Sequence, residues 1–299
     1  MTHGSLARID CAAQSQGYWA RDRAILQRAV GKAKHDVRYV DCIDNDTIIK
    51  KAAENPGSVG REIPRIDWVW TPGKRLRSCI PAHVAFDYCV ATHVMEHVPD
   101  TIGWLNQIFE VMHDGAVLAL ALPDRRYGMD YYRRETTLGD LVGNWLHAPS
   151  RPTTAQVVDF LSQAFYDTRP PPDHRMFDVS QPFAAAPRHY SDGQALDFAA
   201  LSHRDGIYLD VHCTVWTPAS FVEVMSRVIG MGLINAQLSE PIGRNPSSGW
   251  DEFIIHMTKL GEPRISRHDL LKRASFTNAI PITAKHWLRH ATSKLRRAG

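Results

Sequence analysis

The densest group of residues able to do chemistry is the segment HVMEH at positions 93–97. If this segment were helical, His93 and His97 would lie one turn apart on one face, where both could bind one metal ion with Glu96 as a base. The surroundings do not fit a long helix, because an apolar run precedes the segment directly and Pro99 follows it. No later acidic helix stands out as a source of a third ligand. We therefore predict that the chain has no metal site and that Glu96 and His97 orient a strand-to-helix turn.

The same five residues match the pattern H-x-x-E-H and so resemble the signature of the zinc peptidases called inverzincins. Those peptidases carry the motif deep within a long helix, which this part of the sequence does not offer. A zinc peptidase is therefore kept only as an alternative from another enzyme class.

The elements that must position these residues form one strand–helix–strand unit. Residues 86–91 are a nearly continuous apolar run, which is typical of a buried parallel strand. Residues 101–112 place apolar side chains on one face of a helix, and Gly115 interrupts the pattern. Residues 116–122 form a second apolar run that ends at Pro123. Such a unit builds a parallel sheet with helices on both faces.

The last part of the sheet is predicted to be antiparallel. A helix over residues 218–229 begins at Pro218, with Thr217 as its N-cap. Two strands, over residues 233–238 and 252–258, follow without a helix between them, so they must pair antiparallel. We therefore predict an α/β fold, in which a doubly wound, mostly parallel sheet ends in an antiparallel hairpin.

Composition divides the chain into segments. Residues 1–35 have no clear pattern, and we predict that the α/β domain occupies residues 36–262. Within it, residues 145–210 contain seven prolines and offer only one helix, over residues 154–166, which predicts a lid inserted over the sheet. Residues 263–299 form a basic tail.

Two motifs around the central strands make the chain resemble a known family. FDYCVATHVMEHVPD at residues 86–100 resembles the fourth-strand segment of class I S-adenosylmethionine-dependent methyltransferases. VMHDGAVL at residues 111–118 stands where that family has a V-L-K-P-G-G segment. The resemblance covers about residues 36–259 and implies the Rossmann-like fold of that family.

Two further motifs narrow the likeness to a bacterial subgroup that is often found with polysaccharide-biosynthesis enzymes. PDRRY at residues 123–127, followed by TTL at residues 136–138, resembles a segment that this subgroup carries after its fifth strand. DVHCTVWTP at residues 210–218 is similar to the subgroup's H-x-H-x-W-T-P segment, with Thr214 in place of the second histidine.

The resemblance implies S-adenosylmethionine as cofactor. Asp41 matches the acid that accepts hydrogen bonds from the ribose hydroxyls, a task that suits an ionised carboxylate because it only accepts. Asp67 matches the acid near the adenine. The loop under the methionine part is matched by Ala91, Thr92 and His93.

The family's Gly-rich loop after the first strand has no clear counterpart. It belongs about twenty residues before the ribose acid, where residues 21–34 contain only Gly31. Either the first strand and its loop are degenerate, or the chain begins downstream of them. The alternative to an enzyme is therefore a non-catalytic binding or scaffold protein of a glycan pathway that has lost cofactor binding.

The resemblance also implies methyl transfer by in-line displacement at a sulfonium, for which a protein mainly positions the substrates in a dry site. A hydroxyl acceptor is helped by a general base as well. The candidates for this base are His93, Asp124 and His212. An anionic or sugar substrate suits Arg125, Arg126 and Tyr127. We predict methylation of a sugar or glycan-related hydroxyl, with Asp124 or His212 as the base.

Composition excludes several classes of protein. The 299 residues are 44% hydrophobic and 22% charged, as in soluble globular proteins. The longest apolar run, residues 116–122, is far too short to span a membrane. The five scattered cysteines form no C-x-x-C pair and the N-terminus shows no signal segment, so we expect a cytoplasmic protein.

Positive charge is concentrated at the C-terminus. Residues 270–299 contain seven Lys and Arg and no acid, which leaves 28 basic against 32 acidic residues in the rest. This mildly acidic body argues against nucleic acid as a partner. A helix over residues 284–297 would place Trp287 and Leu288 beside basic residues, which predicts peripheral contact with the inner face of an anionic membrane.

Overall fold

The computed structural model describes residues 5–9, 36–54, 65–165, 182–243 and 252–276. The chain divides into two compact units, Met1–Arg264 and Ile265–Gly299. The first unit is built around a β-sheet, and the second contains helix α9 (Arg267–Phe276). The predicted tail helix over residues 284–297 lies outside the described residues. No helix in the described ranges is long and apolar enough to cross a membrane.

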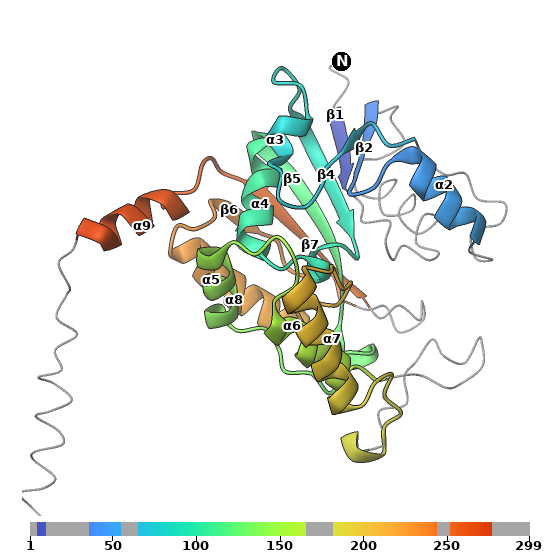
Figure 1. Ribbon diagram of the computed structural model, residues 1–299. Helices are drawn as coiled ribbons and strands as arrows, with labels where there is room; N and C mark the ends of the chain where they lie inside the picture. Colours follow the sequence, from blue (N-terminus) through green and yellow to red (C-terminus); the bar gives the residue numbers. More distant parts are fainter. Residues whose placement is uncertain (1–4, 10–35, 55–64, 166–181, 244–251, 277–299) are drawn as a thin grey trace, which may run out of the picture. The chain divides into compact units, whose positions relative to one another are not determined.

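Within the described part of the first unit, the strands form one seven-stranded sheet in the order β3-β2-β1-β4-β5-β7-β6 (Figure 1). Neighbouring strands from β3 to β5 are parallel, whereas β7 runs antiparallel to both β5 and β6. The strands are β1 (Ser5–Ile9), β2 (Asp36–Asp41), β3 (Trp68–Val69), β4 (Phe86–Thr92), β5 (Met112–Pro123), β6 (Ala236–Leu238) and β7 (Glu252–Lys259). Because helices α2 (Asn45–Glu54), α3 (Leu76–Cys79) and α4 (Thr101–Glu110) alternate with the parallel strands β2 to β5, the predicted α/β class is confirmed.

Helices α4 to α8 each begin after a residue whose side chain caps them. Asp100 begins the helix after β4, since its carboxylate accepts a hydrogen bond from the Gly103 amide. The helices are α2 (Asn45–Glu54), α3 (Leu76–Cys79), α4 (Thr101–Glu110), α5 (Leu138–His147), α6 (Thr154–Gln163), α7 (Asp192–Asp205) and α8 (Pro218–Gly230). Short 3₁₀ turns are η2 (Met95–His97), η3 (Arg125–Tyr127) and η5 (Phe183–Ala185).

The predicted strand–helix–strand unit forms the centre of the core. On α4, Ile102, Leu105 and Ile108 are fully buried, as the apolar pattern of this helix predicts. On β5, consecutive residues from Leu118 to Leu122 are all buried. Both faces of this strand are therefore covered, which explains why its sequence is continuously apolar instead of alternating.

The first strand requires a correction to the predicted domain boundary at residue 36. β1 lies between β2 and β4 and pairs in parallel with both, so that Ile9 stands opposite Val40 on one side and Ala91 on the other. The strand was missed because its five residues, SLARI, are too few and too polar to resemble a buried strand. The expected cofactor loop after it falls in residues 10–35, which lie outside the described residues.

The segment over residues 145–210 contains more regular structure than the sequence predicts. The predicted helix is present as α6, but a second helix, α7, follows it and packs against it. Both contribute to a small apolar cluster that includes Val157 and Ala195. Helix α7 was missed because it is mostly polar, although a capping box of Ser191 and Gln194 marks its start. Its role as a lid stays a prediction.

The N-cap of α8 gives a first test of the fold. Thr217 accepts a hydrogen bond from the Ser220 amide, and Pro218 stands in the first turn, so the predicted cap is confirmed. We expect Thr217→Ala to lower the free energy of unfolding by about 1 kcal/mol, because the amide loses its acceptor. Urea unfolding measures this change, and a Thr217→Ser variant, which keeps the hydroxyl, serves as the control. An equal decrease in the free energy of unfolding in Thr217→Ala and Thr217→Ser would contradict the capping role of Thr217.

Candidate active site

The candidate site lies at the carboxyl edge of the parallel strands. β2 ends at Asp41, β4 ends at Thr92, and Asp124 directly follows β5. Glu252 begins the antiparallel strand β7 opposite Pro123, and so reaches the same edge from the other direction. In open α/β sheets, ligands bind outside this edge.

The turn after β4 presents the segment that the sequence singled out. His93 adopts a left-handed backbone conformation with φ of 52°, which is uncommon for a residue other than glycine. Its amide donates to the carbonyl of Ala121 on β5, which fixes the turn at the end of the sheet. Glu96 and His97 then lie in η2, and both are buried. The segment is thus a strand-to-helix turn, as predicted, and not part of a long helix.

His93 is held between two carboxylates. Its Nε2 lies 2.6 Å from Oε2 of Glu252, and its Nδ1 lies 3.3 Å from Oε1 of Glu96. Glu252 and Glu96 are both almost fully buried. Because both ring nitrogens face acids, His93 ties the end of β4 to the start of β7.

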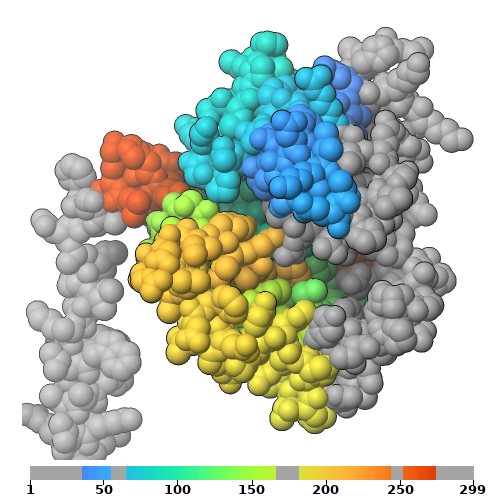
Figure 2. All heavy atoms as spheres, turned by 45° about the vertical axis from the view of Figure 1, so that its right-hand side comes forward, coloured from blue at the N-terminus to red at the C-terminus, as the bar shows by residue number. Residues whose placement is uncertain are grey.

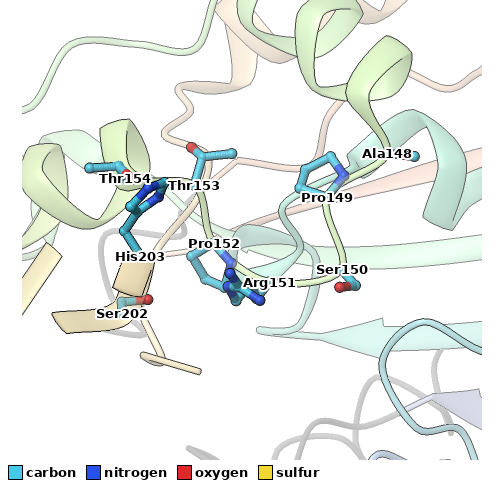
Figure 3. A pocket seen from close by; sticks show the side chains of 9 residues that line it. All are labelled: Ala148, Pro149, Ser150, Arg151, Pro152, Thr153, Thr154, Ser202 and His203. Carbon is cyan, nitrogen blue, oxygen red and sulfur yellow. The ribbon is translucent and has the colours of Figure 1, made fainter. Parts of the chain in front are cut away.

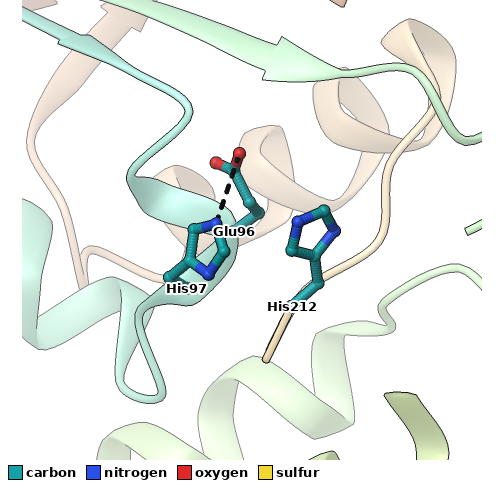
Figure 4. A group of neighbouring side chains, drawn as sticks. All are labelled: Glu96, His97 and His212. Carbon is teal, nitrogen blue, oxygen red and sulfur yellow. Dashed lines mark ion pairs between the residues drawn. The ribbon is translucent and has the colours of Figure 1, made fainter. Parts of the chain in front are cut away.

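His97 faces a different pair of carboxylates. Its Nδ1 lies 2.9 Å from Oδ1 of Asp210, and its Nε2 lies 3.9 Å from Oε1 of Glu96. The ring also makes an edge contact with the ring of His212, with 4.7 Å between centroids. The two imidazoles therefore lie next to each other, and the Glu96 carboxylate lies close to both (Figure 4).

His212 is oriented by a buried ion-pair network. Its Nδ1 lies 2.6 Å from Oδ2 of Asp130, whose other oxygen accepts a hydrogen bond from Arg133. Arg133 also donates to the carbonyl of His212 and, through two nitrogens, to Asp159 on α6. Asp130 holds the ring and Arg133 holds the backbone carbonyl of His212. The Nε2 atom of His212 therefore points toward Glu96 (Figure 4).

The chain that carries His212 is bound directly to η2. The amides of Cys213 and Thr214 both donate to the carbonyl of Glu96. Thr214, which replaces the second histidine of the subgroup pattern, is buried and accepts a hydrogen bond from the indole of Trp216. The threonine therefore supports the segment from within, and it contributes no group to the cluster.

These contacts define a cluster of acids and imidazoles that we call the acid–histidine cluster. Its members are His93, Glu96, His97, Asp130, Asp210, His212 and Glu252. The sequence singled out His93 and His212, whereas no signal marked Asp130 or Glu252, because one sequence cannot show which acids become buried.

At three members of the cluster, burial and the neighbouring charges shift the pKa in opposite directions. Burial pushes the pKa of Glu96 upward, but His93, His97 and His212 outweigh it and leave that pKa below its ordinary value. Burial pushes the pKa of His97 downward, but Asp210 and Glu96 raise it above its ordinary value. Burial likewise opposes ionisation of Asp130, yet His212 and Arg133 hold its pKa well below the usual range. Glu96 and Asp130, whose pKa values are lowered, are therefore ionised at neutral pH.

The PDRRY segment is less available than the sequence suggests. Asp124 is buried, and Arg126 binds both of its oxygens, with 2.9 Å from Nε to Oδ1 and 2.6 Å from Nη2 to Oδ2. The guanidinium of Arg126 also lies over the ring of Tyr127. Arg125 donates to the carbonyl of Tyr131 and pairs with Glu135. Asp124 and Arg126 are thus occupied with each other.

Of the two predicted cofactor acids, only Asp41 reaches the carboxyl edge. Asp41 is buried at the end of β2, and one of its oxygens accepts a hydrogen bond from the Ile43 amide. Asp67 instead precedes β3, where its carboxylate accepts a hydrogen bond from the Tyr39 amide and pairs with Arg38. Asp67 therefore lies just before β3, the outermost strand in the sheet order, and its carboxylate contacts β2 instead of standing at the carboxyl edge with Asp41.

A separate hollow of about 400 Å³ lies away from these residues (Figure 3). It is formed by the α5–α6 connection around Arg151 and by the end of α7 at Ser202 and His203. In Figure 2, the stretch that contains α7 and α8, in yellow to orange, adjoins the segments around α2 and α4, in blue to cyan. None of the predicted site residues lines this hollow.

Comparisons with known proteins add only a likeness of structure. No protein-family model and no curated protein matches the sequence. Similar structures include a putative S-adenosylmethionine-dependent methyltransferase from Listeria monocytogenes, 10% identical over 86% of this chain and 92% of that chain, with a TM-score of 0.38. The CcbJ methyltransferase from Streptomyces caelestis is 13% identical over 87% of this chain and 85% of that chain, also with a TM-score of 0.38.

A third similar structure is the mitomycin 7-O-methyltransferase MmcR, which is 12% identical over 86% of this chain, with a TM-score of 0.35. The chain covers only 49% of the length of MmcR. TM-scores this low carry no functional assignment. The strand order and the residues at the carboxyl edge instead define the chain as a doubly wound α/β protein with a buried acid–histidine cluster at the carboxyl edge of its parallel strands.

Proposed function

We propose that the chain is an S-adenosylmethionine-dependent methyltransferase that acts on a hydroxyl of a sugar or glycan-related acceptor. The observation that carries the proposal is the placement of Asp41 and of the acid–histidine cluster at one edge of the sheet. The sequence motifs that resemble the methyltransferase family fall on β4, η2 and β5, which build this edge. Because a fold alone does not imply an activity, the proposal rests on these residues.

The residues present fit the cofactor. The carboxylate of Asp41 stands at the end of β2 in a fixed orientation, as binding of two ribose hydroxyls requires. Oγ1 of Thr92, in the loop proposed to pass under the methionine part, is buried and has no hydrogen-bond partner among the described residues. Ala91 and His93 flank it in the sequence. When bound, S-adenosylmethionine supplies a methyl group already activated on a sulfonium.

His212 is the best placed of the three base candidates. Asp130 fixes its Nδ1, and among the described residues its Nε2 has no hydrogen-bond partner. His93 instead has acids at both nitrogens, and Asp124 is bound by Arg126 at both oxygens. We assign the proton of the acceptor hydroxyl to Nε2 of His212, with Asp130 holding the ring in the required tautomer.

We also propose a class of acceptor and a cellular location. Arg125, Arg126 and Tyr127 stand beside the edge at the end of β5, where they suit a sugar that carries an anionic group. Polysaccharide biosynthesis is the setting that the subgroup motifs favour. The basic tail would hold the protein at the inner face of the membrane, where its acceptor would be lipid-linked.

Calorimetric titration with S-adenosylmethionine and S-adenosylhomocysteine tests the proposal first. We expect both to bind, and we expect Asp41→Asn to weaken binding roughly 10- to 100-fold, since charged hydrogen bonds contribute about 1.5–3 kcal/mol. Asp46→Asn is the matched control, because Asp46 is an exposed acid on the adjacent helix α2.

Two outcomes would count against an enzyme. Absence of binding at millimolar cofactor by a folded chain would favour the alternative, a methyltransferase-like binding or scaffold protein. Equal weakening by Asp41→Asn and Asp46→Asn would remove Asp41 from the cofactor site. If binding is found, radiolabelled methyl transfer to a panel of nucleoside-diphosphate sugars and oligosaccharides identifies the acceptor.

A further inference from the structure

Three members of the acid–histidine cluster come close enough to share one ion. One ligand atom from each of Glu96, His97 and His212 lies within 4.8 Å of the other two, and all three residues are buried. Glu96 and His97 come from the turn after β4, whereas His212 comes from the segment before α8 (Figure 4). The fold therefore brings together ligands that are distant in the sequence.

The carboxylate of Glu96 is an unsatisfied acceptor in this position. It is about 1% exposed, and neither of its oxygens has a hydrogen-bond partner among the described residues. A buried carboxylate that makes no hydrogen bonds is costly, so native structures pair it or bind it to a cation. The nearest positive groups are imidazoles, and the nearest imidazole nitrogen lies 3.3 Å away without good hydrogen-bond geometry.

Both imidazoles have the outer contacts that are typical of metal ligands. Nδ1 of His212 is hydrogen-bonded to Asp130, and Nδ1 of His97 lies 2.9 Å from Asp210 as an ion-pair contact. A carboxylate at Nδ1 places the proton there and leaves Nε2 as the electron-pair donor, which is the usual support for a histidine that binds a metal. In Figure 4 the Nε2 atoms of both rings lie on the side of Glu96.

We propose that Glu96, His97 and His212 bind one divalent transition-metal ion of the Zn²⁺ type. Two imidazole nitrogens and one carboxylate oxygen suit Zn²⁺ better than Mg²⁺, and three protein ligands leave a position open. Ligands about 2.1 Å from a tetrahedral ion lie roughly 3.4 Å apart, so binding draws the side chains inward by about 1 Å. This revises the prediction that the chain has no metal site, which considered His93 and His97 on one helix.

The use of the ion rests on the proposed methyl transfer, but its binding does not. At the open position, the ion would bind the acceptor hydroxyl and lower the pKa of that hydroxyl. With the ion bound, the electron pair of Nε2 goes to the metal, so His212 would serve as a ligand and the hydroxyl would release its proton to water. Without the ion, Nε2 of His212 itself is the base. Zn²⁺ binding and S-adenosylmethionine binding can thus be measured separately.

Calorimetric titration of the full, untagged and chelator-treated chain with ZnCl₂ tests the site. We expect one equivalent to bind with a micromolar or lower dissociation constant, and MgCl₂ to bind at least 100-fold more weakly. Glu96→Gln and His212→Asn are expected to weaken Zn²⁺ binding at least 100-fold. The matched control is His83→Asn, since His83 is exposed in the loop before β4. Co²⁺ provides a second readout, because four-coordinate Co²⁺ absorbs visible light.

Asp210→Asn guards against variants that fail to fold, because Asp210 is partly exposed and lies outside the buried Arg133 network. It changes an outer contact of His97, and we expect it to weaken Zn²⁺ binding about 10- to 100-fold in a folded protein. Binding that is absent from the wild type, or that persists unchanged in His212→Asn, would overturn the proposed site. S-adenosylmethionine binding is titrated in parallel, so that a missing metal site leaves the cofactor proposal standing and a missing cofactor site leaves the metal proposal standing.

Discussion

Replacing Arg133 by methionine is expected to lower the free energy of unfolding by about 3–5 kcal/mol, because removal of one partner leaves a buried charge uncompensated. Arg133 is about 1% exposed and donates to Asp130, to Asp159 and to the carbonyl of His212. Its guanidinium also lies 5.2 Å from the ring centroid of Phe160 on α6. Methionine keeps much of the packing volume but satisfies none of these acceptors.

The neighbouring residue provides a control for this prediction. Arg134 pairs with Asp140, but both side chains are exposed, so Arg134→Met should change stability by at most about 1 kcal/mol. Urea unfolding of the two variants, followed by circular dichroism, gives the comparison. Similar losses in both variants would contradict the assignment of Arg133 as the buried centre of the network.

The ion-pair network also explains how the segment after β5 supports the site. Asp130 and Arg133 follow η3, Asp159 lies on α6, and His212 precedes α8. Three parts of the chain therefore meet in one set of charge-assisted contacts. Two of these contacts end on His212, since Asp130 holds its ring and Arg133 its carbonyl, and the pairs of Arg133 with Asp130 and Asp159 hold Arg133 in place.

The sequence predicted the central elements well, since their signals are local. The apolar runs of β4 and β5 and the single apolar face of α4 follow directly from burial. β1 was missed, because a five-residue strand with an arginine gives no such signal, and its place depends on pairing with two distant strands. Helix α7 was missed for a related reason, since few of its side chains are apolar.

The site could be predicted only in part. His93 and His212 were found through motifs, and Asp41 through its position after a strand. Asp67 precedes β3 and accepts a hydrogen bond from the Tyr39 amide, and its place near the adenine stays a prediction. The partners Asp130 and Glu252 could not be predicted, since their role depends on burial beside histidines that are far away in the sequence.

Replacing His212 by asparagine is expected to lower the turnover number about 10²- to 10⁴-fold, the usual contribution of a group that handles the transferred proton. Asparagine has no nitrogen that can accept a proton or bind a metal ion. Since His212 belongs to the cluster and not to the proposed ribose site, the dissociation constant of S-adenosylmethionine should stay within about twofold of wild type. The measurement is transfer of a radiolabelled methyl group to the first acceptor that the sugar panel yields.

Two further variants decide whether the effect belongs to His212 itself. Asp130→Asn should lower turnover about 10- to 100-fold, because the ring stays in place but loses the contact that fixes its tautomer. Asp124→Asn should have a smaller effect on turnover, since Arg126 already binds both oxygens of Asp124. His83→Asn should turn over at the wild-type rate. If His212→Asn keeps full turnover while Asp124→Asn abolishes it in a folded chain, the base is Asp124, and the acceptor lies at the end of β5 instead of against the acid–histidine cluster.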